Sequence, residues 1–198
     1  MIRVQAEPSK RVCQGDIFRE VDYVERVLEH EGILEVTKIL FPYVIVLTQD
    51  CDLEQDHNFR TQTKQTQDKW LISVLVAPVY NAEHVFSGEH LQDIGIKSQL
   101  INKKATDGRL LMQNEKPRYH FLEFPSDIPI VPSVIDFKHY FSVPVMYLQE
   151  LKKTNFACTV SELYREDISQ RFSAFLSRIG LPDPSASKQT EIEASPSV

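Results

Sequence analysis

The chain has 198 residues, of which 42% are hydrophobic and 25% are charged, so it is long enough to bury a real core as one globular protein. Its formal net charge of −6 argues against a nucleic-acid affinity of the whole surface, because phosphate binding needs clustered Lys and Arg. The N-terminus lacks an apolar signal core, and no apolar run approaches the roughly 20 residues of a spanning helix. These features exclude secreted and membrane-spanning classes and predict a protein that makes no membrane contact.

The three cysteines, Cys13, Cys51 and Cys158, lie far apart and form no Cys-x-x-Cys pair. This spacing indicates neither a disulfide framework nor a common zinc site. We therefore expect reduced cysteines and a cytoplasmic location.

The first strand-like region runs from Asp16 to Leu47 and predicts three consecutive antiparallel strands. Gly15-Asp16 looks like a turn before the first strand, and residues 29–32 form a polar turn with Gly32 before the second. The third strand, residues 43–47, is an unbroken apolar run opened by Pro42, which is typical of a strand buried on both faces. Residues 55–69 are polar and rich in Gln and Thr, and they predict a loop or an extended hairpin tip.

The second strongly apolar run, residues 70–77, ends at Pro78 and should pair with residues 43–47 in the core of the sheet. Apolar residues at roughly helical spacing predict a helix over residues 83–105, interrupted near Gly95 and followed by an Asp107-Gly108 turn.

The second half of the chain predicts more strands and a final helix. We expect a hairpin of residues 109–112 and 118–124, and further strands over 128–135 and 140–148 whose prolines confine them to edges or bulges. From Ser161 to Ile179, apolar residues that include Phe172 and Phe175 share one helical face. Residues 1–182 should therefore form a single domain, and residues 183–198, which lack any periodicity, a disordered tail.

The order of elements predicts a mainly β protein of the β-rich α+β class. Runs of antiparallel strands with few helices favour a small barrel, with one mid-chain helix and one amphipathic C-terminal helix packed on it.

Over residues 15–80, the chain resembles the PemK/MazF group of toxin ribonucleases. The resemblance lies in Gly15-Asp16-Ile17-Phe18, in the Pro-anchored strand from Pro42 to Thr48 with Gln49-Asp50 after it, and in the apolar strand from Leu71 to Ala77. It implies an SH3-like barrel, which agrees with the strand order above. It also implies metal-independent cleavage of single-stranded RNA, in a toxin-antitoxin or defence-type system.

The catalytic residues of that family are not matched here. The family uses an Arg just before the Pro of the central strand and a Ser or Thr near the end of the next strand, whereas this chain has Phe41 and the Pro78-Val79-Tyr80 segment. An aromatic ring cannot stabilise a developing phosphorane charge as a guanidinium does. Arg60 or Arg118 would have to substitute through the fold.

The densest set of reactive side chains follows the central strand. Thr48, Asp50 and Asp52 are the candidate catalytic residues, and Asp50, Asp52 and His57 are candidate ligands of a divalent metal, because alternate residues of an extended chain point to the same side. The competing interpretation is that both aspartates make side-chain turns at a strand end. Cys51 is expected to be a buried structural residue, since the surrounding carboxylates oppose a thiolate.

A second candidate surface is basic. It would bind nucleic acid through a local stripe, although a solvated helix face explains the same residues, which are Lys97, Lys103, Lys104, Arg109 and Arg118. The remaining histidines are scattered in sequence, and His120 is expected to lie partly buried in a strand.

Two classes of function follow. The chain is expected to be a non-catalytic binding or accessory module for a protein partner or nucleic acid, with a homodimer as one form. The alternative is a ribonuclease or nucleic-acid-processing enzyme with a rearranged site around residues 48–52. No cofactor is expected unless a divalent metal binds there.

Overall fold

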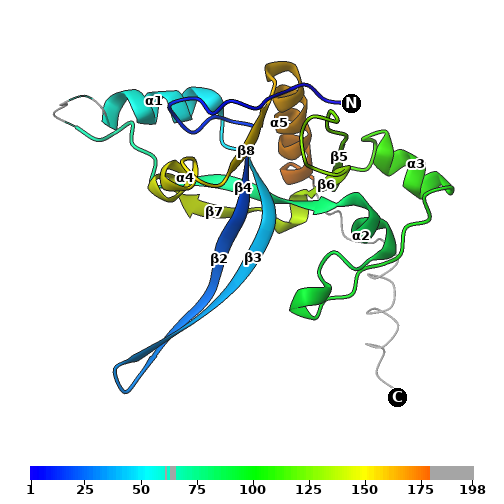
Figure 1. Cartoon of the computed structure of the whole chain (residues 1–198), viewed down its shortest axis with the longest axis horizontal. Coiled ribbons are helices and arrows are strands. Elements are labelled where there is room, and N and C mark those ends of the chain that lie inside the picture. The colour runs from blue at the N-terminus through cyan, green and yellow to red at the C-terminus, as the bar shows by residue number, and fades with distance from the viewer. Residues whose placement is uncertain (61, 63–65, 179–198) are drawn as a thin grey trace, which may run out of the picture.

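A computed structural model describes residues 1–60, 62 and 66–178, and its strands join in one curled antiparallel sheet (Figure 1). The strand order is β1-β8-β2-β3-β4-β6-β5, and β7 pairs with β4 off this path. The strands are β1 (Val4–Gln5), β2 (Asp16–His30), β3 (Ile33–Val46), β4 (Ser73–Asn81), β5 (Tyr119–Leu122), β6 (Ser133–Asp136), β7 (Phe141–Pro144) and β8 (Phe156–Val160). The helices are α1 (Asp50–Arg60), α2 (Ala82–Ser87), α3 (Thr106–Met112), α4 (Val145–Leu151) and α5 (Glu162–Leu176), with 3₁₀ turns η1 (Gln92–Ile94) and η2 (Phe137–His139).

The predicted β-rich, barrel-like α+β class is confirmed. The central strands β3 and β4 pair as predicted, with Ile45 opposite Ala77 and both side chains fully buried. Two hydrophobic cores form within the curled sheet, one containing Phe18, Val44 and Val76, and the other containing Ile17 and Ile45. The expected tail, residues 183–198, lies outside the described residues.

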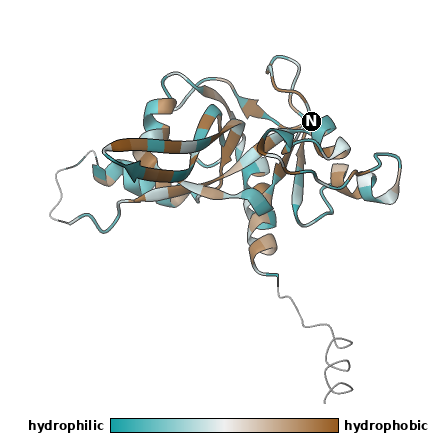
Figure 2. Cartoon of the chain, turned by 90° about the horizontal axis from the view of Figure 1, so that it is seen from below, coloured by the Kyte–Doolittle hydropathy of each residue, from teal (hydrophilic) through white to brown (hydrophobic). Residues whose placement is uncertain are grey.

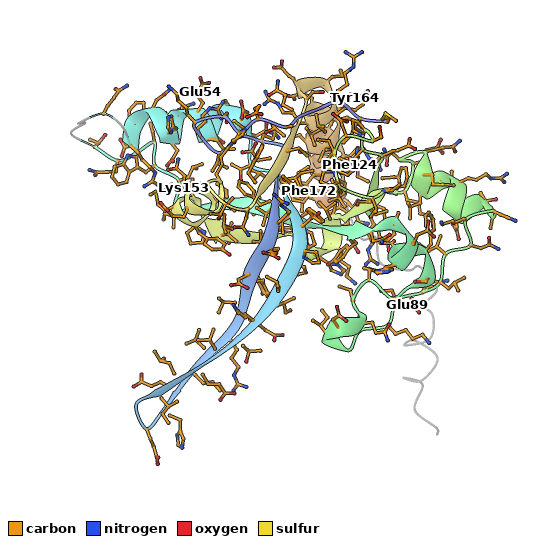
Figure 3. The ribbon with its side chains drawn as sticks, viewed as in Figure 1. Glu54, Glu89, Phe124, Lys153, Tyr164 and Phe172 are labelled. Carbon is orange, nitrogen blue, oxygen red and sulfur yellow. The ribbon has the colours of Figure 1, made fainter. Side chains whose placement is uncertain are left out.

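The predicted C-terminal helix is also confirmed, as α5. Phe172 and Phe175 are buried, and their rings lie 5.5 and 6.0 Å from the ring of Phe137. Figure 3 shows Phe172 directed toward the body of the protein. Ser161 occupies the N-cap position, although its side chain makes no capping hydrogen bond. The apolar face of this helix therefore covers the second core.

The prediction of three strands between Asp16 and Leu47 is wrong, because the region forms one long hairpin of β2 and β3. The chain continues through Pro42 instead of starting a new strand there. Opposite Pro42, Glu20 has a left-handed φ of 53°, and no register pair joins these two residues. The irregular residue Glu20 thus lies opposite Pro42, which has no N–H to donate to the sheet. Residues three apart on a regular strand point to opposite faces, but Phe18 and Val21, on either side of this irregularity, lie in the same core.

Residues 50–60 form α1, so the prediction of a loop from residue 55 is wrong for its first part. Asp50 and Asp52 occupy the first turn, and His57 and Arg60 the last, an order of charges that favours a helix through its dipole. Leu53 and Asp56 are the buried residues of this helix. The sequence did not indicate this helix because the helix is mostly polar and buries few of its residues.

The segments between β4 and α4 differ most from the predictions. β4 continues past Pro78 to Asn81, and it exchanges its partner there: residues 76–78 pair with β3, and residues 79–81 pair with β6. The long helix expected over 83–105 is only α2 and the turn η1. The predicted Asp107-Gly108 turn is instead part of α3. The glycine is needed there because the backbone of Asn102 and Lys103 lies so close that a Cβ would collide with it.

Three strand predictions also need correction. Residues 109–112 belong to α3, so they form no hairpin with β5, which pairs with β6. The strand expected over 128–135 is limited to β6, and the strand expected over 140–148 divides into β7 and α4. Among the described helices, none has the length and apolar character needed to cross a membrane.

Candidate functional site

Two histidines and an aspartate converge where β4, β6 and the segment after α2 meet. One ligand atom from each of His90, Asp136 and His139 can be chosen so that all three lie within 4.8 Å of one another. Within the described ranges 1–60, 62 and 66–178, this is the one group of His, Cys, Asp or Glu side chains close enough to hold a metal ion. We therefore treat this His-Asp-His cluster as the candidate site.

The end of β6 positions two members of the cluster. Asp136 is the last residue of β6 and the N-cap of η2, and its carboxylate accepts a hydrogen bond of 3.0 Å from the backbone N–H of Lys138. One 3₁₀ turn later, Nδ1 of His139 lies 3.4 Å from Oδ2 of Asp136. The cap therefore fixes the spacing between the carboxylate and the imidazole.

Arg118 neutralises the buried carboxylate. Asp136 is fully buried, and it accepts hydrogen bonds of 2.8 Å from Nε and 2.5 Å from Nη2 of Arg118. This bidentate geometry is the strong form of an Arg–carboxylate pair. Hydrogen bonding to Asp136 also raises the pKa of Arg118, so the guanidinium is charged at neutral pH.

Tyr80 and His90 complete the cluster from the opposite side. The Tyr80 hydroxyl lies 3.2 Å from Nδ1 of His139, and the Tyr80 and His90 rings meet edge to face at 4.9 Å. Both ring nitrogens of His90 are buried, and neither makes a hydrogen bond of ordinary length and angle. Burial lowers the pKa of both His90 and His139, against the opposing attraction of Asp136, so both rings are neutral at pH 7.

A cavity of about 470 Å³ borders the cluster. Its walls include Phe41 and Tyr43 from β3, Tyr80 from β4, and His84 and His90 from the segment that follows. Aromatic walls with a few convergent polar groups are typical of small-ligand sites. His90 is the member of the cluster that lines this cavity.

The carboxylates predicted as catalytic residues lie elsewhere and do not act as a pair. Figure 3 shows Glu54 on α1 at the opposite end of the molecule from Glu89, the neighbour of His90. Asp50 accepts hydrogen bonds of 2.9 and 2.8 Å from Arg11 and of 3.1 Å from the Gln14 N–H. Burial opposes its charge, but Arg11, the Gln14 N–H and Arg165 outweigh that effect and lower the pKa of Asp50.

The metal hypothesis for Asp50, Asp52 and His57 rested on an extended chain, and that premise is wrong. On α1, residues two positions apart point about 200° from each other around the helix axis. Asp50 forms an ion pair with Arg11, whereas Asp52 is exposed. Cys51 is also exposed, which corrects the expectation of a buried cysteine, and all three cysteines are unpaired as expected.

Thr48 has a structural role: its hydroxyl accepts a hydrogen bond of 2.7 Å from the backbone N–H of Leu75. Thr48→Val should lower the free energy of unfolding by about 1–2 kcal/mol in a urea titration, because that partly buried N–H loses its acceptor. Thr48→Ser keeps the hydroxyl and should lose less than half as much. Equal losses for the two variants would show that the hydrogen bond contributes nothing.

The structure does not gather the five predicted basic residues into one free stripe. Arg118 binds Asp136, and Lys103 pairs with Glu83. Lys97 lines a separate small pocket beside Gly88, while Lys104 and Arg109 are exposed. The basic charge is thus partly neutralised within the chain.

Sequence reasoning missed the His-Asp-His cluster because its members come from distant segments. One signal was present: the Asp136-x-x-His139 spacing places two ligand types one 3₁₀ turn apart. Nothing near His90 in the sequence indicated that its ring would join them.

No protein-family model and no curated protein sequence matches this chain. The candidate site is therefore assigned from the positions of its side chains alone.

Proposed function

We propose that this chain is a non-catalytic binding module that docks a protein partner through its long β2–β3 hairpin. The PemK/MazF resemblance suggests an accessory role in a toxin-antitoxin or defence-type system. We call residues Asp22–Leu40 the arm, because in Figure 1 this part of the hairpin projects well away from the body. The supporting observation is that one face of the arm exposes five apolar side chains, which share this face with the charged residues Asp22, Glu29 and Lys38.

The register of the hairpin defines this face. Val27 pairs with Val36, and the side chains of such an antiparallel pair lie on the same side of the ribbon. Alternation on both strands, with a bulge between Val24 and Arg26, brings five apolar side chains to that side, each with more than half of its surface exposed: Val24, Val27, Leu34, Val36 and Leu40. The arm points toward the viewer in Figure 2, where its strands carry brown, hydrophobic segments.

An isolated ribbon of two strands is only marginally stable in water. The arm has no third strand or helix against its apolar face among the described residues, and Figure 3 shows its side chains directed into open space. A partner that covers this face would bury apolar surface and add to the stability of the ribbon. This is the physical reason to favour docking over a purely structural role for the arm.

Charge favours a basic protein over nucleic acid or a second copy. The arm carries five carboxylates, Asp22, Glu25, Glu29, Glu31 and Glu35, against the two cations Arg26 and Lys38. This excess of negative charge repels a phosphate backbone. Two arms packed against each other would also place like charges together, which is unfavourable. A partner with a basic rim around an apolar surface fits best.

The ribonuclease alternative gains no support from the geometry. Asp50 is held by Arg11, and the Thr48 hydroxyl is used by Leu75. The carboxylate of Asp50 is therefore neutralised, and the Thr48 hydroxyl is held against the sheet. The binding module is therefore the better proposal.

The test compares partner binding by the wild type and by a Val24→Thr/Val27→Thr/Val36→Thr variant. Threonine keeps the shape and the strand preference of valine but removes the apolar surface, so the hairpin should still fold. We expect a protein that copurifies stoichiometrically with the wild type to bind the variant at least ten-fold more weakly. Ile72→Thr is the matched control, because Ile72 is 93% exposed but lies outside the arm.

Equal partner binding by the wild type and the triple variant would refute docking through the arm. A concentration-dependent dimer of the purified wild type that the triple variant abolishes would instead assign the face to a second copy. Stoichiometric RNA in the wild-type preparation that withstands the three substitutions would favour the nucleic-acid reading.

A further inference from the structure

We propose that His90, Asp136 and His139 bind one divalent transition-metal ion of the zinc, cobalt and nickel type. The site lies beside the cavity at the β4–β6 junction, and it does not depend on the proposed role of the arm.

The geometry brings the ligand atoms nearly to bonding positions. Three ligands about 2.0–2.2 Å from a tetrahedral metal lie roughly 3.3–3.6 Å apart. The three chosen atoms here lie within 4.8 Å of one another, and the Asp136–His139 pair is already at 3.4 Å. A small movement of the His90 side chain, which no hydrogen bond of ordinary geometry restrains, would close the site.

The His90 ring is the independent observation that points to a ligand. Neither buried ring nitrogen makes a hydrogen bond of ordinary geometry, and the contact of the ring with the His84 backbone is weaker than that, so this buried histidine calls for an explanation such as a missing ion. A metal ion at the centre of the cluster would satisfy one of them. A structural role in packing against Tyr80 would not require a histidine at this position.

Arg118 orients the carboxylate and leaves it able to bind. Oδ1 of Asp136 accepts from Nε of Arg118 at 2.8 Å and from the Lys138 N–H, whereas Oδ2 accepts from Nη2 of Arg118, shares the same Nε–H at the longer distance of 3.1 Å, and faces His139. Each carboxylate oxygen has two lone pairs, and the shared Nε–H is the longer contact of Oδ2, so a metal can displace this contact and bind the second lone pair. A hydrogen-bonded ligand of this kind is typical of metal sites.

The ligand set selects the class of ion. Two imidazoles and one carboxylate suit zinc, cobalt or nickel, while Mg²⁺ and Ca²⁺ require mainly oxygen ligands. The charge of Arg118 offsets that of Asp136, which should weaken affinity without changing this preference. The fourth position is left to water from the cavity or to the hydroxyl of Tyr80, 3.2 Å from His139.

Calorimetric titration of the metal-free full chain with ZnCl₂ and with MgCl₂ tests the site. We expect one zinc ion per chain and no saturable heat with magnesium. His90→Phe and His139→Phe should each weaken zinc binding at least ten-fold. His84→Phe is the matched control, because His84 lines the same cavity but lies outside the cluster, and it should bind zinc as the wild type does.

Cobalt provides a second readout that does not depend on loss of binding. Co²⁺ added to the wild type should give the visible absorption of a four-coordinate site, and His90→Cys should add a thiolate-to-cobalt charge-transfer band. The absence of saturable zinc binding by the wild type would overturn the proposal. Zinc binding that His90→Phe and His139→Phe leave unchanged would also overturn it, because the ion would then be held by other surface residues.

Discussion

Lys152→Met should lower the free energy of unfolding by about 3–5 kcal/mol, because it leaves the carboxylate of Asp16 buried without its counter-ion. Asp16 is fully buried, and Lys152 is 8% exposed, with 2.6 Å between Nζ and Oδ2. The ammonium group also donates to the hydroxyl of Ser9 and to the carbonyl of Arg11, so it joins the N-terminal segment and the start of β2 to the end of α4. Urea titration at pH 7 measures the loss.

Lys153 provides the matched control for this substitution. Its ion pair with Glu150 is 68% exposed on both sides, so Lys153→Met should change stability by less than about 1 kcal/mol. Lys152→Met/Asp16→Asn removes both charges and should recover much of the stability. Burial already raises the pKa of Asp16 against the attraction of Lys152, so the loss in Lys152→Met should shrink as acid protonates Asp16. A loss that does not depend on pH and that the double variant does not recover would assign the effect to packing alone.

The second large effect concerns acid stability and His120. This residue is 3% exposed on β5, its Nδ1 has no hydrogen-bond partner, and burial together with the charge of Arg171 lowers its pKa to about 3. The folded state therefore keeps the ring neutral at pH 5, whereas the unfolded chain protonates it near pH 6.5. Unfolding takes up a proton in this window, so stability falls with acid by about 1.4 kcal/mol per pH unit below pH 6.5.

Replacing His120 by Leu removes this proton uptake. Between pH 6.5 and pH 4.5, the wild type should lose about 2–3 kcal/mol more than His120→Leu does, as measured by urea titrations across this range. His30→Leu serves as the control, because the His30 side chain is 91% exposed at the tip of the hairpin, and it should follow the wild type. Parallel curves for wild type and His120→Leu would show that the buried ring titrates as it does in the unfolded chain, or that Asp167, whose Oδ2 is 4.0 Å from Nε2 of His120, compensates its charge.

The sequence alone determined the β-rich class, the two core strands and the C-terminal helix. In each case the signal was local: an unbroken apolar run predicted residues 43–47 as a strand, a strongly apolar run predicted residues 70–77, and helical spacing of Phe172 and Phe175 predicted α5. The second strand in fact begins at Ser73, since β4 is Ser73–Asn81. Burial then imposed these patterns, because most of the residues concerned contact one of the two cores.

Where local signals conflicted with tertiary contacts, the contacts prevailed. Pro42 and Pro78 look like strand ends, yet both lie within strands, because one faces the irregular Glu20 and the other marks an exchange of partner strands. Gly108 looks like a turn residue, yet it lies in α3, where another backbone approaches too closely for a side chain. A single sequence does not reveal which neighbour a residue will meet.

The candidate sites depended on the tertiary structure to a greater degree. The acidic cluster after residue 47 was visible in the sequence. In the fold, however, Asp50 forms an ion pair with Arg11, and the Thr48 hydroxyl accepts a hydrogen bond from the Leu75 N–H. His90, Asp136 and His139 are up to 49 positions apart and meet only because β4 leaves β3 to pair with β6. The sequence determined which chemical groups this protein has, and the pairing of its strands decided which of them can act together.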